Sequence, residues 1–347
     1  MIHKSIEFGK IDNIVLFGGS WLTAKFIQVL IDSNIKVTLF TSLRHFEGIV
    51  SSDGLTLSQI TEKLDIVVFT SNDINKDSRL KEFVSDSTLG IAIGAAWIFE
   101  TNIVELFGGK LLDFMGIDLP HYRGGAHYSW KILAENRTGA CNLQLIHGGA
   151  ESFHKGEIIK RSKYTFPKSA RVPQDYFHYA LKEEISFLLS FLLEVDKEVV
   201  FPMKTLDELQ SSYFPFLNTN IQGWIDWKWS AKEIYRFICA FDSPYAGAST
   251  LLSGKRVFLK KCSYIEDDFN FHPFHSGLIY RVANGKVFVF ARGGTLIIEK
   301  VDYENSVESR LTLEGARFYT SNSKLESALC DEVTYESRGL EVKKHIC

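Results

Sequence analysis

Residues 13–32 read NIVLFGGSWLTAKFIQVLID, and this stretch decides the class of fold. Residues 13–17 form a continuous apolar run, which is typical of a strand buried on both faces inside a parallel sheet. A Gly-Gly-Ser turn follows, and apolar residues then recur at helical spacing over residues 21–32. The stretch therefore predicts a buried strand, a tight turn and an amphipathic helix, which together are the repeating unit of an α/β protein.

The same signature recurs through the first half of the chain, at residues 36–40, 65–69 and 90–94. Apolar strands separated by helix-sized gaps predict a Rossmann-like, mostly parallel sheet with helices on both faces. In such folds a ligand lies beyond the carboxyl ends of the strands, so the loops at 18–21 and 94–99 are candidate binding loops. Because the first loop lacks the full G-x-G-x-x-G spacing, we favour a plain strand-to-helix turn over a nicotinamide site.

The second half of the chain changes its pattern. Residues 174–195 are apolar at helical spacing and predict a long helix that closes the first domain. Ser230 and Glu233 fit a capping box at the start of another helix. Short runs of period two then predict a small, OB-like β-barrel, and a short helix is expected near residues 314–319. The predicted domains are a Rossmann-like domain at 1–200, a linker at 201–220, a barrel domain at 221–302 and a C-terminal extension at 303–347.

Composition narrows the class of protein further. The 347 residues carry a net charge of -3, so no global basic field favours nucleic acid as a partner. Five cysteines without a C-x-x-C pair favour free thiols in a reducing compartment over a disulfide framework or a zinc site. We find no signal-peptide pattern and no run of about 18 apolar residues. We therefore expect a soluble, cytoplasmic protein without a membrane partner and without a metal.

Residues 111–156 hold the densest cluster of candidate site residues. They comprise an apolar run, a Pro/Arg/Gly turn, a helical stretch, a second apolar run and a polar loop. The cluster contains four of the ten histidines with nearby charged groups, namely His121, His127, His147, His154, Asp113, Asp118, Arg123 and Glu151. Loops carried by a rigid scaffold are where chemistry usually sits, so we expect the functional site here.

Two segments of the chain resemble the formyltransferase family that uses 10-formyltetrahydrofolate. That family includes methionyl-tRNA formyltransferases and sugar N-formyltransferases. Residues 119–126, LPHYRGGA, are similar to the turn that follows its fifth strand. Residues 223–227, GWIDW, and 240–248, AFDSPYAGA, are similar to the beginning of its C-terminal barrel domain. The resemblance implies a formyltransferase fold with 10-formyltetrahydrofolate as co-substrate.

The resemblance also implies binding roles for particular residues. The residues implied for the folate are Ala95, Ala96, Trp97, Ile98, Phe99 and His147. The residues implied for the amine substrate are His121, Arg123, Gly124 and Gly125. Arg123 either binds a substrate carboxylate or phosphate or pins the turn to backbone carbonyls, and both readings stay open. The two glycines are expected to allow a close approach of the following helix to the sheet.

The catalytic positions depart from the family's pattern. The family's Asn-x-His pair falls on Asp113 and Met115, and its loop aspartate falls on His154 or, counted without a gap, on Glu151. Formyl transfer needs a base for the amine proton, donors for the oxyanion and a carboxylate to orient an imidazole. The thioether of Met115 supplies none of these. Asp113 and His154 would restore a carboxylate and imidazole pair with positions exchanged, while His127 competes for the same role.

The favoured interpretation is an enzyme that formylates an amine on a small substrate, most plausibly a nucleotide-linked amino sugar. A tRNA substrate is disfavoured because the chain is acidic and residues 113–156 are mixed in charge. Met115 motivates a second hypothesis, a catalytically altered family member that binds folate or a sugar nucleotide. A third hypothesis is a transferase that uses a different acyl donor. A homodimer is left open.

Overall fold

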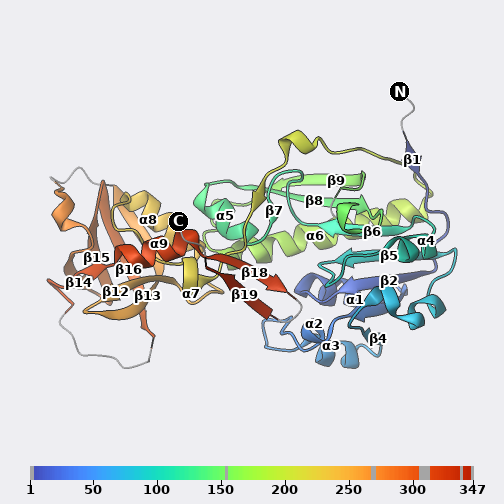
Figure 1. Cartoon of the computed structure of the whole chain (residues 1–347), viewed down its shortest axis with the longest axis horizontal. Helices are drawn as coiled ribbons and strands as arrows, with labels where there is room; N and C mark the ends of the chain where they lie inside the picture. The colour runs from blue at the N-terminus through green and yellow to red at the C-terminus, as the bar shows by residue number, and fades with distance from the viewer. Residues whose placement is uncertain (1–3, 153–154, 267–270, 305–312, 337–338, 345–347) are drawn as a thin grey trace. The chain divides into compact units, whose positions relative to one another are not determined.

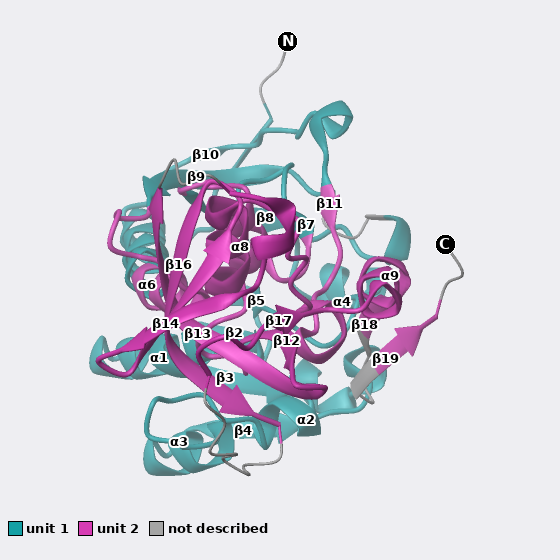
Figure 2. Ribbon diagram, turned by 90° about the vertical axis from the view of Figure 1, so that its left-hand side faces the viewer, with its two compact units in different colours: residues 1–123, 138–165, 180–212 teal, residues 124–137, 166–179, 213–347 magenta. Residues whose placement is uncertain are grey.

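The computed structural model describes residues 4–152, 155–266, 271–304, 313–336 and 339–344 (Figure 1). The chain divides into two compact units, coloured separately in Figure 2. Unit 1 comprises residues 1–123, 138–165 and 180–212, and unit 2 comprises residues 124–137, 166–179 and 213–347. The units are therefore interleaved along the chain, whereas the sequence predicts contiguous ranges, because two short segments of the first half group with the second.

Unit 1 is built on a seven-stranded sheet with the order β4-β3-β2-β5-β6-β8-β9. Its strands are β2 (Asn13–Gly18), β3 (Lys36–Thr41), β4 (Val67–Thr70), β5 (Thr88–Ile93), β6 (Leu111–Met115), β8 (Thr138–Leu145) and β9 (Ile158–Thr165). The first five run parallel, and β8 and β9 are added antiparallel. The predicted mostly parallel, Rossmann-like sheet is confirmed. Short strands β1 (Ser5–Ile6) and β10 (Phe201–Pro202) pair with each other outside it.

Helices cover both faces of this sheet. They are α1 (Trp21–Asp32), α2 (Leu43–Phe46), α3 (Leu57–Lys63), α4 (Thr101–Leu106) and, from Ala180 onward, α6 (Pro173–Asp196). Single turns are η1 (Ile74–Lys76), η2 (Ser78–Glu82), η3 (Ala150–Ser152) and η4 (Glu208–Gln210). Helix α1 begins where predicted because Ser20 and Thr23 form a capping box. One buried cluster joins α1 and α6 to the sheet, and a second contains Phe17 and Phe99.

Close packing between strands explains the glycine at the end of β2. Gly18 has φ +140°, and a Cβ on it would lie 2.1 Å from the carbonyl oxygen of Ile93 on β5. Any side chain at this position would therefore separate two adjacent strands. The close packing of β2 against β5 accounts for the glycine, which supports the plain strand-to-helix turn.

Unit 2 contains a six-stranded antiparallel sheet with the order β14-β15-β16-β13-β12-β17. Its strands are β12 (Ala248–Leu252), β13 (Lys255–Glu266), β14 (Ile279–Ala283), β15 (Lys286–Ala291), β16 (Gly294–Tyr303) and β17 (Phe318–Tyr319). Ile279 N donates to Ala316 O at 2.9 Å and Phe318 N donates to Gly277 O at 2.8 Å. These bonds join the two edges of the sheet and close it into the predicted small barrel.

Unit 2 also contains helices and short strands outside this sheet. They are α5 (His127–Leu133), α7 (Thr219–Gln222), α8 (Ala231–Ala240), η5 (Pro273–His275), α9 (Asn322–Cys330), β11 (Tyr213–Phe214), β18 (Glu332–Glu336) and β19 (Gly339–Lys343), together with β7 (Arg123–Gly124), which begins in unit 1. The capping box predicted for α8 is confirmed, since Ser230 N donates to Glu233 Oε2 at 2.7 Å. Ser129 on α5 donates to Ala240 O at the end of α8, 2.7 Å away.

Two expectations fail in the C-terminal region. The short helix expected at 314–319 is wrong: Phe318 and Tyr319 form β17, and the helix begins at Asn322. The backbone of this segment is taken up by barrel closure, and its alternation of a buried and an exposed ring suits a strand. Cys330 is disulfide-bonded, so the expectation of free thiols is wrong there, whereas Cys141, Cys239 and Cys262 are free.

Candidate active site

Asp113 lies on β6, on the face of the unit 1 sheet that also carries the buried Gln144. Its register partners are Ala92 on β5 and Gln144 on β8. Directly paired residues share a face, so the side chains of Asp113 and Gln144 project to the same side. Gln144 is 1% exposed and donates from Nε2 to the carbonyl oxygen of Gly156 at 2.6 Å. The half-buried carboxyl group of Asp113 therefore lies on the face that holds the end of the β8–β9 loop.

Two positions further along β6, Met115 lies in an apolar cluster with Ile117, Leu119 and Ile158. The fully buried Asn142 donates from Nδ2 to the carbonyl oxygens of Met115 at 3.0 Å and Ile117 at 2.6 Å. These bonds hold the chain as it leaves the strand. The position thus serves packing, and its side chain has no group that can move a proton.

The β8–β9 loop folds onto the segment that follows β5, which we name the 95–99 segment. Gly149 N donates to Phe99 O at 2.8 Å. A Cβ on Gly148, which has φ +78°, would lie 2.9 Å from backbone atoms of Thr101. Only glycine permits so close an approach with this backbone conformation. The structure therefore brings together two regions that the sequence predicts as functional.

An imidazole and a carboxylate pair across the two ends of this loop. His147 Nε2 lies 2.5 Å from Glu157 Oε2, with side-chain exposures of 47% and 20%. Burial opposes ionisation of Glu157, but the hydrogen bond with His147 lowers the pKa of its carboxyl group. Of the two loop residues predicted for catalysis, Glu151 is exposed on η3 and His154 lies outside the described residues. Their roles, and the role of His147 toward a cofactor, stay predictions.

The 95–99 segment is held by a side chain, Asn75, that sequence reasoning missed. Asn75 donates from Nδ2 to Ile98 O at 3.0 Å and accepts from Glu100 N at 2.9 Å. The indole of Trp97 donates to Asn72 O at 3.2 Å. Asparagine is common in surface turns, so nothing in the sequence distinguishes this one. The segment itself is half-buried at its two alanines and its tryptophan.

The turn after β6 is pinned by charged and polar contacts. The guanidinium of Arg123 binds both carboxylate oxygens of Glu208, at 2.5 and 2.9 Å, and the hydroxyl of Ser211 at 2.8 Å. Its backbone N–H donates to Ser212 O at 2.9 Å. These contacts favour the pinning role for Arg123, with a carboxylate in place of the expected carbonyls. A substrate role for Arg123, or for the half-buried His121, stays a prediction.

Gly124, Gly125 and His127 belong to unit 2. A Cβ on Gly124 would lie 1.9 Å from the carbonyl oxygen of Phe214, and one on Gly125 would lie 2.1 Å from the ring of Phe216. The glycines are thus explained by the close approach of residues 213–216, where the sequence suggested an approach to the sheet. His127 is half-buried at the start of α5. The substrate and catalytic roles of these residues stay predictions.

Two buried carboxyl groups lie near the end of β6. Asp118 is 8% exposed and forms ion pairs with Arg161 and, at 2.9 Å, with Lys163. Burial opposes ionisation of Asp118, but the two cations lower the pKa of its carboxyl group. Glu184 on α6 is 6% exposed, and burial raises the pKa of its carboxyl group to about 8. Its Oε1 lies 2.4 Å from the point where a Cβ on Gly116 would stand.

The protein therefore contains an α/β unit, with Asp113 and Gln144 side by side on its sheet, and a small antiparallel barrel. Residues 219–315 match the C-terminal domain of formyl transferases. The chain is 26% identical over 223 residues to a methionyl-tRNA formyltransferase from Prochlorococcus marinus (strain NATL2A). That match covers 58% of this chain and 61% of the length of the relative.

Two solved structures share the fold. An N-formyltransferase from Helicobacter canadensis, in complex with folinic acid and dTDP-3-aminofucose, has a TM-score of 0.61 at 16% identity, over 84% of this chain and 99% of that chain. WlaRD, a sugar 3N-formyl transferase in the presence of dTDP and 5-N-formyl-THF, has a TM-score of 0.59 at 16% identity, over 86% of this chain and 100% of that chain. Residues 219–315 thus match a formyl transferase domain, and most of the chain shares the fold of these two N-formyltransferases.

Proposed function

We propose that this protein is an N-formyltransferase that moves a formyl group from 10-formyltetrahydrofolate to the amine of a nucleotide-linked amino sugar. The observation that carries the proposal is the formyl transferase C-terminal domain at residues 219–315, joined to an α/β unit of the same fold as the sugar N-formyltransferases. Those two structures hold a formyl-folate together with a dTDP or dTDP-sugar ligand. Their ligands supply the substrate class of the proposal.

The proposed reaction needs groups near Asp113 that can stabilise an oxyanion and accept a proton. The amine nitrogen attacks the formyl carbon, and a tetrahedral intermediate carries the oxyanion. The bond from that carbon to the folate nitrogen then breaks, the amine nitrogen loses a proton, the folate nitrogen takes one up, and tetrahydrofolate leaves. Asp113 is the ionisable residue of β6 and supplies the carboxylate, either as proton acceptor or as the partner that orients His154.

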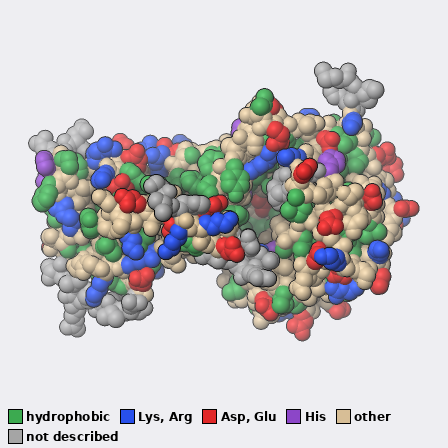
Figure 3. Space-filling view, in the orientation of Figure 1, with side chains coloured by type: hydrophobic (Ala, Val, Ile, Leu, Met, Phe, Trp, Pro, Cys, Tyr) green, Lys and Arg blue, Asp and Glu red, His purple; other side chains and the backbone are tan. Residues whose placement is uncertain are grey.

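Two further functions remain as alternatives. The apolar surroundings of Met115 favour a catalytically altered family member that binds folate or a sugar nucleotide without turnover. A different acyl donor would use the same fold. The relative from Prochlorococcus acts by name on methionyl-tRNA, so tRNA is included in the test. Lys/Arg and Asp/Glu side chains are interspersed over the face shown in Figure 3, which does not favour a tRNA backbone there.

The reaction is tested with the full-length protein and 10-formyltetrahydrofolate. The amine substrates are dTDP-linked and UDP-linked amino sugars and, separately, methionyl-tRNA, and the formation of tetrahydrofolate is followed. We expect turnover with an amino-sugar nucleotide and none with tRNA. Saturable folate binding without turnover on any amine would favour the altered member. An absence of folate binding would contradict the proposal and point to another donor. Size-exclusion chromatography with light scattering tests whether the protein forms the homodimer that the sequence leaves open.

Replacement of the candidate catalytic residues tests their roles. We expect Asp113→Asn to lower kcat/KM by about 100-fold or more, because a positioned acid or base typically contributes this much. His154→Asn and Glu151→Gln are compared side by side, since only one of them can fill the family's aspartate position. Glu105→Gln on α4 is an exposed matched control and should leave kcat/KM unchanged. Full activity in both the His154 and Glu151 variants would eliminate the exchanged pair and its alternative together.

A further inference from the structure

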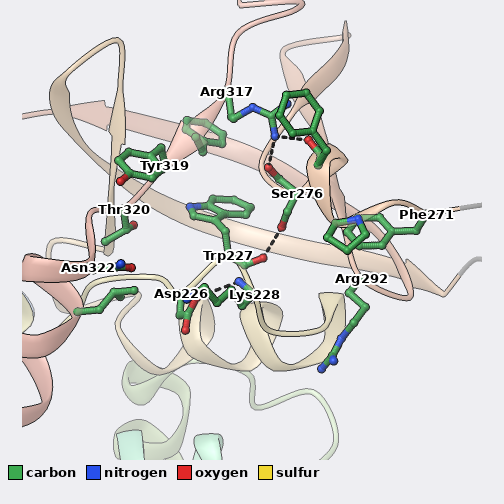
Figure 4. Close-up of a pocket in the computed structure, with 14 residues that line it drawn as sticks. Asp226, Trp227, Lys228, Phe271, Ser276, Arg292, Arg317, Tyr319, Thr320 and Asn322 are labelled. Atoms are coloured by element: carbon green, nitrogen blue, oxygen red, sulfur yellow. Dashed lines mark hydrogen bonds between the residues drawn. The ribbon is translucent and has the colours of Figure 1, made fainter.

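A cavity lies wholly within unit 2, at the place where the barrel closes (Figure 4). Its volume is about 490 Å³, which is in the range of small-molecule sites. One wall comes from residues 226–228 and 271–276, inside the matched formyl transferase domain. The other wall comes from residues 317–325, which follow that domain. The cavity is therefore built by a segment beyond the matched domain.

Barrel closure makes the base of the cavity rigid. The ring of Trp227 stacks on that of Phe318, with centroids 5.6 Å apart and planes 14° from parallel. The two side chains are 8% and 1% exposed. The indole N–H of Trp227 donates to Thr250 Oγ1 at 2.9 Å, and that hydroxyl donates to Tyr319 O at 3.1 Å. This base is an apolar platform of fixed orientation.

Three other aromatic rings line the cavity, those of Phe271, Phe274 and Tyr319, and the last two are open to solvent. Phe274 is 76% exposed and Tyr319 is 57% exposed. Figure 4 shows Tyr319 on one side of Trp227 and Arg317 on another. Large exposed aromatic side chains beside an apolar platform form a surface on which a planar ring can stack.

The described lining residues are positively charged on balance. They comprise the cations Lys228, Arg292 and Arg317 and one carboxylate, Asp226. Lys228 forms no ion pair with the residues that the structure describes, and Arg292 lies 3.6 Å from Glu233 outside the cavity. An excess of fixed positive charge in a cleft with apolar walls attracts an anionic group.

One wall also offers hydrogen-bonding groups. Asn322 is exposed at the start of α9, and its side-chain amide makes no hydrogen bond within the described part of the chain. An amide presents both a donor and an acceptor, which matches the edge of a nucleobase. Thr320 lines the same wall beside it in Figure 4.

We propose that this cavity binds a nucleoside phosphate, with its base against the aromatic lining residues Trp227 and Tyr319, the base edge at Asn322 and its phosphates toward Lys228. This site lies in unit 2 and is additional to the substrate and folate sites of the proposed formyl transfer. Its occupancy is independent of whether the α/β unit turns over an amine.

Calorimetric titration of the full-length protein tests the site. Thymidine diphosphate, uridine diphosphate and adenosine diphosphate are the probes, with thymidine and pyrophosphate as fragments. We expect one class of binding site that Tyr319→Ala weakens by about tenfold, the usual effect of removing one stacked aromatic ring. Tyr319→Phe keeps the ring and should retain the affinity of the parent protein. If the amino-sugar nucleotide site also binds the probe, the stoichiometry is about two and falls toward one in Tyr319→Ala.

A second substitution tests the electrostatic part of the proposal. Lys228→Ala should weaken nucleoside diphosphate binding several-fold and reduce its dependence on salt, because a phosphate contact is lost. Lys255→Ala removes an exposed lysine that does not line the cavity and should have no effect. Binding that Tyr319→Ala and Lys228→Ala leave unchanged would overturn the proposal, as would binding of folate in place of all three nucleotides. Formyl transfer measured on the same variants reports separately on the proposed function.

Discussion

Two buried carboxyl groups near the end of β6 have opposite surroundings. Asp118 is 8% exposed and lies between Arg161 and Lys163 of β9, whereas Glu184 is 6% exposed and forms no ion pair with the described residues. The pKa of Asp118 is lowered because its cations outweigh burial, while burial raises the pKa of Glu184 to about 8. Two residues of similar solvent exposure thus differ in charge, because Asp118 is a charged carboxylate and Glu184 is a neutral acid.

The alternation of β9 explains the difference. Arg161 and Lys163 project to one face of the strand, and Ser162 between them projects to the other. Ser162 pairs in register with Cys141, whose thiol pKa is raised by burial and then by the nearby Glu184. The face toward α6 therefore carries the acid of Glu184 and the thiol of Cys141, and its cation, Lys160, pairs with Glu194 further along α6 at 2.6 Å. A single strand separates the two environments.

The largest effect that we expect comes from Glu184→Gln. A carboxyl group whose folded-state pKa is raised contributes stability that is complete below the unfolded-state pKa near 4.5 and is lost as pH rises through about 8. The variant cannot ionise, so its advantage in free energy of unfolding should grow with pH. We expect a gain on the order of 3–5 kcal/mol at pH 8 and about 1 kcal/mol or less at pH 5. Urea unfolding at pH 5, 6, 7 and 8 measures it.

Glu183→Gln on the same helix is the matched control for this experiment. Glu183 is half-buried, and its replacement should leave the shape of the stability profile as in the parent protein. A Glu184→Gln gain that is the same at every pH would show that Glu184 is already charged in the folded state. The comparison with Asp118 would then lose its basis.

Asp118→Ala should act in the opposite direction and with a smaller effect. It leaves Arg161 and Lys163 without their carboxylate, and their side chains are 29% and 55% exposed, so solvent compensates in part. We expect a loss of about 2 kcal/mol in free energy of unfolding at pH 7. Because the folded-state pKa of Asp118 is lowered, this loss should shrink as pH falls below about 4. Acid titration of both proteins by circular dichroism checks the sign.

Gly116→Ala gives the smallest predicted effect and probes the contact with Glu184 directly. The new Cβ would stand 2.4 Å from Glu184 Oε1, which is the end of a flexible side chain and can move. We expect a loss of about 1 kcal/mol, typical of modest overpacking. In a Glu184→Ala background the same substitution should cost almost nothing. Additive losses in the double variant would show that the two residues are not in contact.

Much of the scaffold followed from local pattern. Helix α1 matches the predicted range, and α6 differs from its prediction by one residue at each end. The residues that hold the candidate site together were harder to predict from sequence pattern. Asn75 holds the 95–99 segment through a bond to a residue that is distant in the chain. Gln144 holds Gly156 across a loop. A polar residue of this kind has no distinctive spacing in the sequence, so only the folded chain identifies it.

The sequence by itself determined the mostly parallel sheet, the small antiparallel barrel and the resemblance to formyltransferases, because apolar periodicity and the turns at 119–126 and 240–248 are local features. Tertiary structure decided the rest. The placement of Asp113 beside Gln144 depends on strand register, and the neutral state of Glu184 depends on its burial in an interior formed by several elements. The cavity at Trp227 exists because residues 315–318 close the barrel. Burial and charge environment are sums over neighbours from the whole chain, and a sequence read in order does not contain those sums.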